Sequence, residues 1–69
     1  MDVIVICKLR DRRKAQGLSQ RDLGALVNID HKAIGNYETN KTKMNILTAA
    51  KLAIVLNCKI DDLYEYRRN

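Results

Sequence analysis

Two helix-start signals close together constrain the fold of this chain more than any other feature. Ser19 is a good N-cap residue, and Asp22 stands where a capping box needs an acidic side chain. Asp30 is a second N-cap residue in the same window. The first helix is predicted to end near Val27, so only a short turn separates the two helices. Two short helices joined in this way must cross steeply and pack against each other.

The residues inside this window suit a steep crossing. Gly24 is small enough to let the second helix approach the first, and Asn28 tolerates left-handed backbone better than other residues except glycine. Apolar residues occupy the inner faces of both helices: Leu23, Val27, Ile29, Ile34 and Tyr37. These features together predict a helix-turn-helix over about residues 20–39, with the second helix ending near Thr39 or Asn40.

The remaining segments predict further helices around this unit. One runs from Lys8 to Gln16 and is closed by Gly17. Another spans residues 46–57 behind an Asn45 cap, with Ile46, Ala49, Leu52, Ala53 and Leu56 on one apolar face. A last short helix or turn covers Ile60 to Tyr64 or Tyr66, with Asp61 and Asp62 favourable near its start.

The fold class that follows is all-α: five short helices in a single domain of residues 1–69. The β-branched run Val3–Ile6 favours an extended start, so a short N-terminal β-strand is an optional addition. At 69 residues one hydrophobic core is marginal, and tight helix packing or a partner is expected to support it.

The run GLSQRDLGALVNIDHKAIGNYETNK resembles the Cro/C1-type (XRE-like) helix-turn-helix family of phage and bacterial repressors. The resemblance continues through LTAAKLAIVLNCKIDDLYEY and covers about residues 6–66. It implies a compact lambda-repressor-like domain of the short, free-standing kind. Gly24, Asn28, Asn40 and Met44 depart from the family, which prefers alanine, glycine, glycine and proline there.

A helical projection of the second helix of the helix-turn-helix, which begins after Asp30, separates two sides at about 100° per residue. Ile34, Tyr37 and Glu38 point toward the protein, whereas Lys32, Asn36 and Thr39 point outward. Lysine can donate to guanine and asparagine can pair with adenine in the major groove. The resemblance implies base contacts from His31, Lys32, Ala33 and Asn36. The alternative is that these are ordinary solvated side chains.

Gly35 lies on a flank of the same helix, although glycine costs roughly 1 kcal/mol there against alanine. We expect it to leave room where a DNA backbone approaches. Gly35→Ala should then stabilise the fold and weaken DNA binding.

Polar and basic residues around the window predict contacts to DNA phosphates: Gln20, Arg21, Thr39, Lys41 and Lys43. For Gln20 the alternative is a residue that merely follows a cap, and for the 41–43 loop it is a solvated loop. The net charge of +5, from 13 Lys and Arg against 8 Asp and Glu, favours a polyanionic partner.

Glu38 is a carboxylate on the inner side of its helix, so it needs a partner. The resemblance places Arg13 where the family has the helix-one arginine that pairs with this glutamate. We therefore expect a structural Arg13–Glu38 ion pair; the alternative is an exposed glutamate without a partner.

Other functions find little support in the sequence. There is no catalytic set and no cofactor motif, and the single histidine, His31, lacks the neighbours of a metal site. The apolar run Val3–Cys7 is too short to cross a membrane, and no small-molecule pocket is expected at this size. Cys7 and Cys58 suggest small core residues kept reduced in a cytoplasmic protein.

The predicted function is a sequence-specific DNA-binding transcriptional regulator, with repression the preferred action, in a bacterium or phage. One such helix reads few base pairs, so a homodimer on a palindromic double-stranded operator is expected, with half-sites ~34 Å apart. Its dimer surface is predicted in the C-terminal segment (Ile60, Leu63, Tyr64, Tyr66) or at the edge of the Val3–Ile6 strand. The alternative is an antitoxin or protein-binding adaptor with the same fold.

Overall fold

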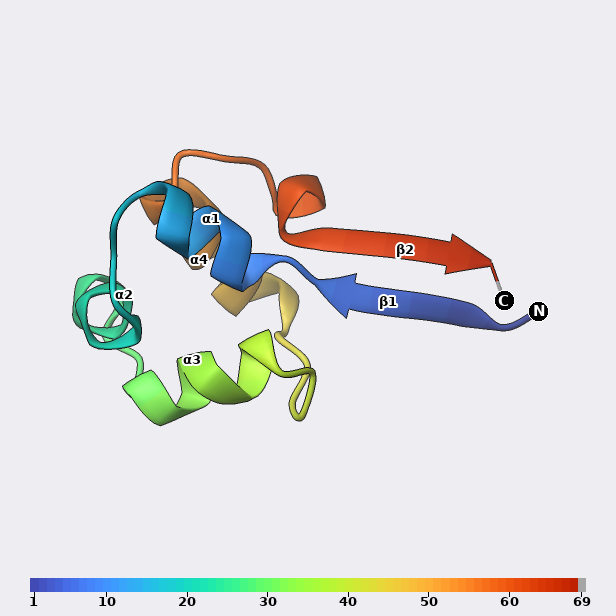
Figure 1. The fold of residues 1–69 in the computed structure, drawn as a ribbon, viewed down its shortest axis with the longest axis horizontal. Helices are drawn as coiled ribbons and strands as arrows, with labels where there is room; N and C mark the ends of the chain where they lie inside the picture. Colours follow the sequence, from blue (N-terminus) through green and yellow to red (C-terminus); the bar gives the residue numbers. More distant parts are fainter. Residues whose placement is uncertain (69) are drawn as a thin grey trace.

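The computed structural model describes residues 1–68, which form four α-helices, one 3-10 turn and two strands. In chain order these are β1 (Val3–Cys7), α1 (Leu9–Ala15), α2 (Gln20–Val27), α3 (His31–Glu38), α4 (Ile46–Val55), η1 (Ile60–Leu63) and β2 (Tyr64–Arg68). The helices gather at one end of the molecule, and the two strands project from them side by side (Figure 1).

The strands form an antiparallel pair in which Val3 lies opposite Arg68 and Cys7 lies opposite Tyr64. The Lys8 N–H continues the pairing by donating to the Leu63 carbonyl at 2.7 Å. This arrangement confirms the optional N-terminal strand, and it joins the two ends of the described chain.

The prediction of five helices is wrong, because the last segment makes only one 3-10 turn and then extends. The Asp62 carboxylate accepts from the Lys59 N–H at 3.0 Å and so fixes this single turn. Beyond it, Tyr64 and Tyr66 have strand-favouring side chains, and β1 offers unpaired backbone groups that a strand can satisfy. Pairing therefore wins over continuing a short helix.

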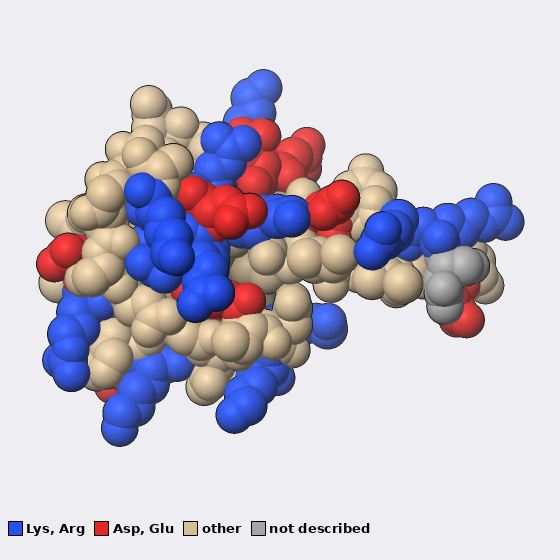
Figure 2. Space-filling view, in the orientation of Figure 1, with Lys and Arg blue, Asp and Glu red and all other residues tan. Residues whose placement is uncertain are grey.

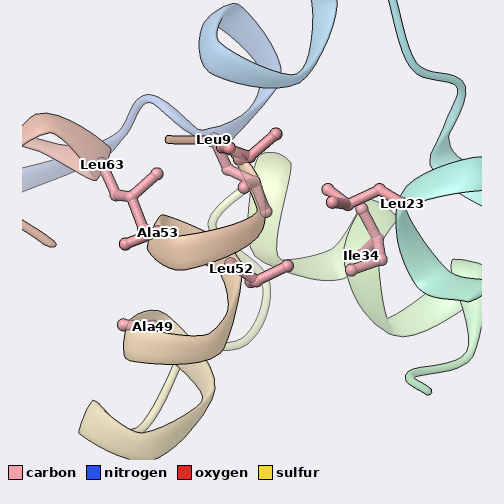
Figure 3. Packing of buried hydrophobic residues seen from close by; sticks show 8 residues of the cluster. Leu9, Leu23, Ile34, Ala49, Leu52, Ala53 and Leu63 are labelled. Carbon is pink, nitrogen blue, oxygen red and sulfur yellow. The ribbon is translucent and has the colours of Figure 1, made fainter. Parts of the chain in front are cut away.

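Eight buried apolar residues make the core (Figure 3): Leu9, Leu23, Ile34, Ala49, Leu52, Ala53, Leu56 and Leu63. Leu23 and Ile34 meet between α2 and α3, which ties the two helices to the rest of the core. Four of the five residues expected on the apolar face of α4 are buried. Ile46 is not, because it is the first residue of α4 and lies off the centre of that face.

Each of the four α-helices is followed by a residue with left-handed backbone. Gly17 has this role after α1, where it was expected, and Asn28, Asn40 and Asn57 have it after α2, α3 and α4, with φ values of 58°, 62° and 55°. Such residues end helices because they turn the chain out of the helical path.

Candidate nucleic-acid interface

The start of α2 is fixed by a reciprocal pair of hydrogen bonds. The Asp22 N–H donates to the Ser19 hydroxyl at 2.9 Å, and the Ser19 N–H donates to the Asp22 carboxylate at 3.1 Å. The hydrogen bond from the Ser19 N–H lowers the pKa of Asp22 below its usual range, and the Ser19 hydroxyl makes a smaller contribution in the same direction. This is the capping box that the sequence predicts.

The turn between α2 and α3 is compact. Asn28 adopts φ 58° and ψ 46°, and the Ile29 N–H donates to the Gly24 carbonyl at 2.9 Å. A Cβ atom at Gly24 would lie 2.3 Å from the Ile29 carbonyl oxygen, so no larger residue fits without moving the backbone. After the turn, the Asp30 carboxylate accepts from the Lys32 N–H at 2.7 Å and begins α3.

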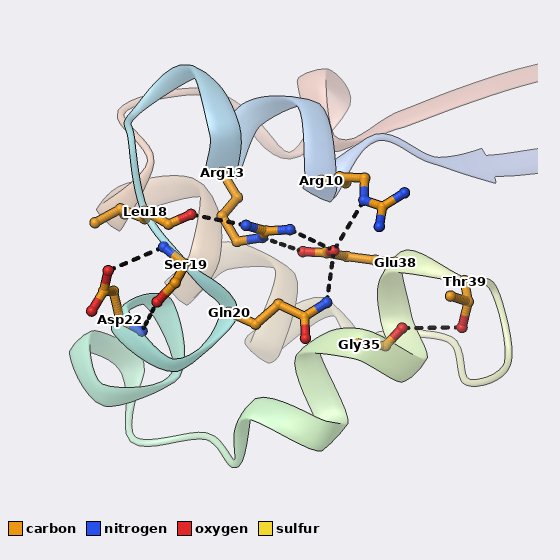
Figure 4. A network of polar contacts seen from close by, with 9 residues as sticks. All are labelled: Arg10, Arg13, Leu18, Ser19, Gln20, Asp22, Gly35, Glu38 and Thr39. Atoms are coloured by element: carbon orange, nitrogen blue, oxygen red, sulfur yellow. Dashed lines mark hydrogen bonds and ion pairs between the residues drawn. The ribbon is translucent and has the colours of Figure 1, made fainter.

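A polar cluster on the inner side of α3 holds the helix in place (Figure 4). Glu38 accepts two hydrogen bonds from the Arg13 guanidinium, at 2.6 and 3.0 Å, and a third from the Gln20 amide at 3.1 Å. Only 2% of the Glu38 side chain is exposed. Arg13 also donates to the Leu18 carbonyl at 2.8 Å, and Arg10 lies 3.8 Å from Glu38. The cluster therefore connects α1, α2 and α3.

Burial raises the pKa of Glu38. The hydrogen bonds from Arg13 and Gln20 and the positive charges of Arg13 and Arg10 together lower this pKa by more than burial raises it, so the net shift is downward. The hydrogen bond to Glu38 raises the pKa of Arg13. Both groups are therefore charged at neutral pH, and each charge is compensated by the other.

The Gln20 side chain makes a contact that the sequence did not predict. Its amide faces inward to Glu38 and packs over Gly35, where a Cβ atom would lie 3.4 Å from the Gln20 side-chain oxygen. The space beside Gly35 is thus filled by Gln20, and the expectation that it is left open for a DNA backbone is wrong. The family resemblance predicts the Arg13–Glu38 pair, but no pattern in the sequence predicts the hydrogen bond from Gln20 to Glu38.

The outer side of α3 carries the predicted base-contacting residues. Lys32 and Asn36 are exposed, whereas Ala33 and His31 are half-buried. The His31 ring nitrogen Nδ1 lies 3.6 Å from the Asp30 carboxylate. Every large apolar side chain of α3 is at least partly buried, so its solvent-facing surface is polar.

Basic residues flank this surface. Arg21 on α2 and Lys41 and Lys43 in the loop after α3 are all exposed. In the space-filling view, Lys and Arg side chains project from the lower edge of the molecule, along which α3 lies (Figure 2). The Thr39 hydroxyl donates to the Gly35 carbonyl at 3.0 Å, so this group must rotate before it can donate to a phosphate.

Within residues 1–68, no group of three or more His, Cys, Asp or Glu side chains is arranged to hold a metal ion. None of the described helices has the length and apolar character needed to cross a membrane. Cys7 and Cys58 are free thiols, half-buried against the core.

Two capped helices, a tight left-handed turn and a polar outer helix flanked by basic side chains define a helix-turn-helix DNA-binding domain. The chain belongs to the Cro/C1-type helix-turn-helix family: the family model described as Helix-turn-helix matches residues 9–63. No curated protein sequence matches the chain closely enough to count as a relative.

Two solved structures combine a similar fold with appreciable sequence identity. The restriction-modification controller protein C.AhdI from Aeromonas hydrophila is 32% identical, with a TM-score of 0.76 over 81% of this chain and 85% of its own. The c2 repressor of P22, crystallised with a synthetic operator, is 33% identical, with a TM-score of 0.75 over 80% of this chain and 83% of its own.

A third structure, from Bacteroides fragilis, is similar in fold alone. It has a TM-score of 0.83 over 90% of this chain and 100% of its own, but only 16% identity. The matches agree on a lambda-repressor-like architecture, here with four helices, a 3-10 turn and a two-stranded sheet.

Proposed function

We propose that this protein is a sequence-specific transcriptional repressor that binds a palindromic operator as a homodimer, with α3 in the major groove. The observation that carries the proposal is the two-sided character of α3. Its inner side is fixed by Ile34 and by the buried Glu38 cluster, while its outer side presents Lys32 and Asn36 to solvent. A rigid helix with a free polar face is what base readout requires.

Lys32 and Asn36 are the proposed main base readers, with His31 and Ala33 contributing at the start of the helix. Lys32 can donate to guanine O6 and N7, and Asn36 can pair with adenine N6 and N7. Ala33 offers a methyl group suited to the thymine methyl. These residues lie at positions 31–36, within about one and a half turns of α3.

Arg21, Lys41 and Lys43 are the proposed phosphate contacts, because they are exposed on both sides of α3. Thr39 is proposed as a weaker one, after its hydroxyl rotates. Gln20 donates one amide hydrogen to Glu38, and its second amide hydrogen is the one proposed to donate to a phosphate. P22 c2 is a repressor and C.AhdI is a restriction-modification controller protein. The similarity to both supports a regulatory role for this chain.

An antitoxin or adaptor that binds a protein through α3 is less well supported. Protein-binding surfaces are typically centred on apolar and aromatic side chains. No large apolar side chain of α3 is among the exposed ones in the described chain, whereas its solvent-facing residues are polar or basic.

The test is selection of bound sequences from random duplex DNA, followed by affinity measurements over a salt series. The proposal predicts a selected palindrome and an affinity that falls steeply as salt rises. Absence of binding, or binding that does not depend on salt, would contradict it.

Alanine variants then separate the proposed roles. Lys32→Ala and Asn36→Ala should each cost about 1–3 kcal/mol and relax preference at one base position. Lys43→Ala should weaken all sequences alike and reduce the salt slope by about 1. Lys51→Ala, on the exposed side of α4, is the matched control for loss of one charge. Equal losses from all four variants would refute the assignment of base readers.

A further inference from the structure

The two-stranded β1–β2 sheet has two unlike faces. In an antiparallel pair, opposed residues share a face and successive residues alternate between faces. The observed register therefore places one set on what we term the Val/Tyr face: Val3, Val5, Cys7, Tyr64, Tyr66 and Arg68. The opposite face carries Ile4, Ile6, Glu65 and Arg67.

The Val/Tyr face is apolar and uncovered. Val3 is 50% exposed, Val5 43% and Tyr66 75%. A groove runs along this face to Ile60 and Asp61 at the base of the sheet, where it meets the helices, and a second groove continues from Val5 and Tyr64 toward Met44 and Ile46. An isolated two-stranded sheet is marginally stable, and a contiguous apolar surface of this kind marks an interaction site.

We propose that a second copy of this chain packs on the Val/Tyr face, sheet against sheet and antiparallel, so that the Val3–Arg68 end (the tip) of each sheet covers the Cys7–Tyr64 end (the base) of the other. This inference specifies the surface of the homodimer that the proposed function requires. Tyr66 and Val3 of each copy then lie over the groove beside Ile60 and Tyr64 of the other.

The charges on this face select the antiparallel arrangement and a like partner. Arg68 lies at the tip of the face, and Asp61 lines the groove at its base. Antiparallel packing of two copies brings Arg68 of each beside Asp61 of the other, which forms two opposite-charge contacts. Packing in the parallel sense would instead set the two Arg68 side chains against each other.

The placement of α3 also favours the face over the strand edge. In Figure 1 the strands lie side by side in the plane of view, with α3 lower and to their left. Face-to-face packing about an axis in that plane, across the strands, leaves both α3 helices on one side of the dimer. Edge-to-edge antiparallel pairing needs an axis perpendicular to the sheet, which sends the two α3 helices to opposite sides.

The spacing is also suitable. A five-residue strand is about 17 Å long, and in this arrangement the helices of one copy lie at each end of the paired sheets. That separates the two α3 helices by a distance on the order of the ~34 Å between half-sites. Of the residues first expected at the dimer surface, Leu63 is excluded because it is fully buried; Ile60, Tyr64 and Tyr66 belong to the proposed surface.

Val5→Lys and Ile4→Lys provide a matched pair of variants, since the two residues are neighbours of similar exposure on opposite faces. Sedimentation equilibrium of the DNA-free protein should show a dimer. Val5→Lys should raise its dissociation constant at least about tenfold, and Ile4→Lys should leave it within about twofold. Circular dichroism of each variant verifies that it is folded.

Charge exchange gives a second measurement. Asp61→Arg alone and Arg68→Asp alone should each weaken the dimer, and the double variant should restore it. A monomeric wild-type protein, equal effects of Val5→Lys and Ile4→Lys, or no restoration in the double variant would overturn the proposal.

Binding to a single half-site duplex separates this inference from the proposed function. If the half-site is bound but the Val/Tyr face is not the dimer surface, only the present inference fails. If the dimer forms as described but no DNA is bound, only the proposed function fails.

Discussion

Gly24 and Gly35 both lie inside helices, yet their surroundings differ in kind. A Cβ atom at Gly24 would meet a backbone oxygen at 2.3 Å, whereas a Cβ atom at Gly35 would meet the end of a glutamine side chain at 3.4 Å. Backbone cannot yield without moving the turn, but a glutamine side chain can shift by a few tenths of an ångström. The first glycine is therefore required by the crossing of α2 and α3, and the second is not.

Alanine substitution at the two positions should have opposite effects on stability. Gly35→Ala should raise the free energy of unfolding by up to about 1 kcal/mol, because alanine is the better helix former. Gly24→Ala should lower it by about 1–3 kcal/mol through overpacking, although the same helix preference applies. Urea denaturation followed by circular dichroism measures both values, with an unchanged m-value as the control. Equal stability of the two variants would contradict this explanation.

The site residues show how far single positions could be predicted. The caps at Ser19 and Asp30 and the turn at Asn28 follow from local backbone chemistry, and the structure has all three. The position of Gln20 does not, because it depends on a carboxylate that is distant in sequence and reaches α2 only through packing. Local rules contain no information about such a contact.

At the scale of helices and loops, asparagine ends three of the four α-helices in left-handed backbone. Asparagine tolerates this conformation better than most residues, but glycine adopts it without steric cost. Asn57 has this backbone role alone, because its side chain makes no hydrogen bond within residues 1–68. Asn40 has a second role, because its side-chain oxygen accepts from the Cys7 N–H at 3.2 Å and connects the end of α3 to β1.

Replacing these asparagines by glycine should separate the two roles. Asn57→Gly should stabilise the chain by up to about 1 kcal/mol by relieving the left-handed cost. Asn40→Gly gains the same relief but loses a hydrogen bond worth about 1 kcal/mol, so its net effect should be close to zero or destabilising. Thermal unfolding of both variants gives the comparison. A larger gain at position 40 than at position 57 would show that the bond to Cys7 contributes nothing.

The sequence predicts the first strand but not the second. Val3–Ile6 is β-branched throughout and predicts extended backbone by itself. Tyr64–Arg68 follows two aspartates that favour a helix start and contains charged residues, so its local signal is ambiguous. Its structure is decided by the unpaired backbone of β1, which is more than fifty residues away in sequence.

For the whole molecule, two carboxylates with lowered pKa values make the free energy of unfolding depend on pH. The pKa of Glu38 is lowered in the folded chain, as is that of Asp22. In the acid range the unfolded chain therefore binds more protons than the folded one, and the free energy of unfolding rises with pH. This contribution is complete above the ordinary glutamate pKa of about 4.3 and is lost as the pH falls through the lowered value.

Glu38→Gln should consequently flatten the decline of stability below about pH 5 while lowering stability at pH 7. Denaturant unfolding at a series of pH values measures both effects. Asp2→Asn, which removes an exposed carboxylate just before β1, is the control for net charge. An acid decline as steep in Glu38→Gln as in the wild type would rule out this ion pair as its source.

The contrast between the packed inner side of α3 and its exposed outer side also affects which substitutions the protein tolerates during evolution. Ile34, Glu38 and the Asp30 cap fix the helix, whereas the side chains of Lys32 and Asn36 extend into solvent. Substitutions at such exposed positions usually alter stability by no more than about 0.5 kcal/mol. On the proposed function, changes at Lys32 and Asn36 would therefore alter the DNA target at little cost in stability, whereas changes at Glu38 or Arg13 would disrupt the buried ion pair.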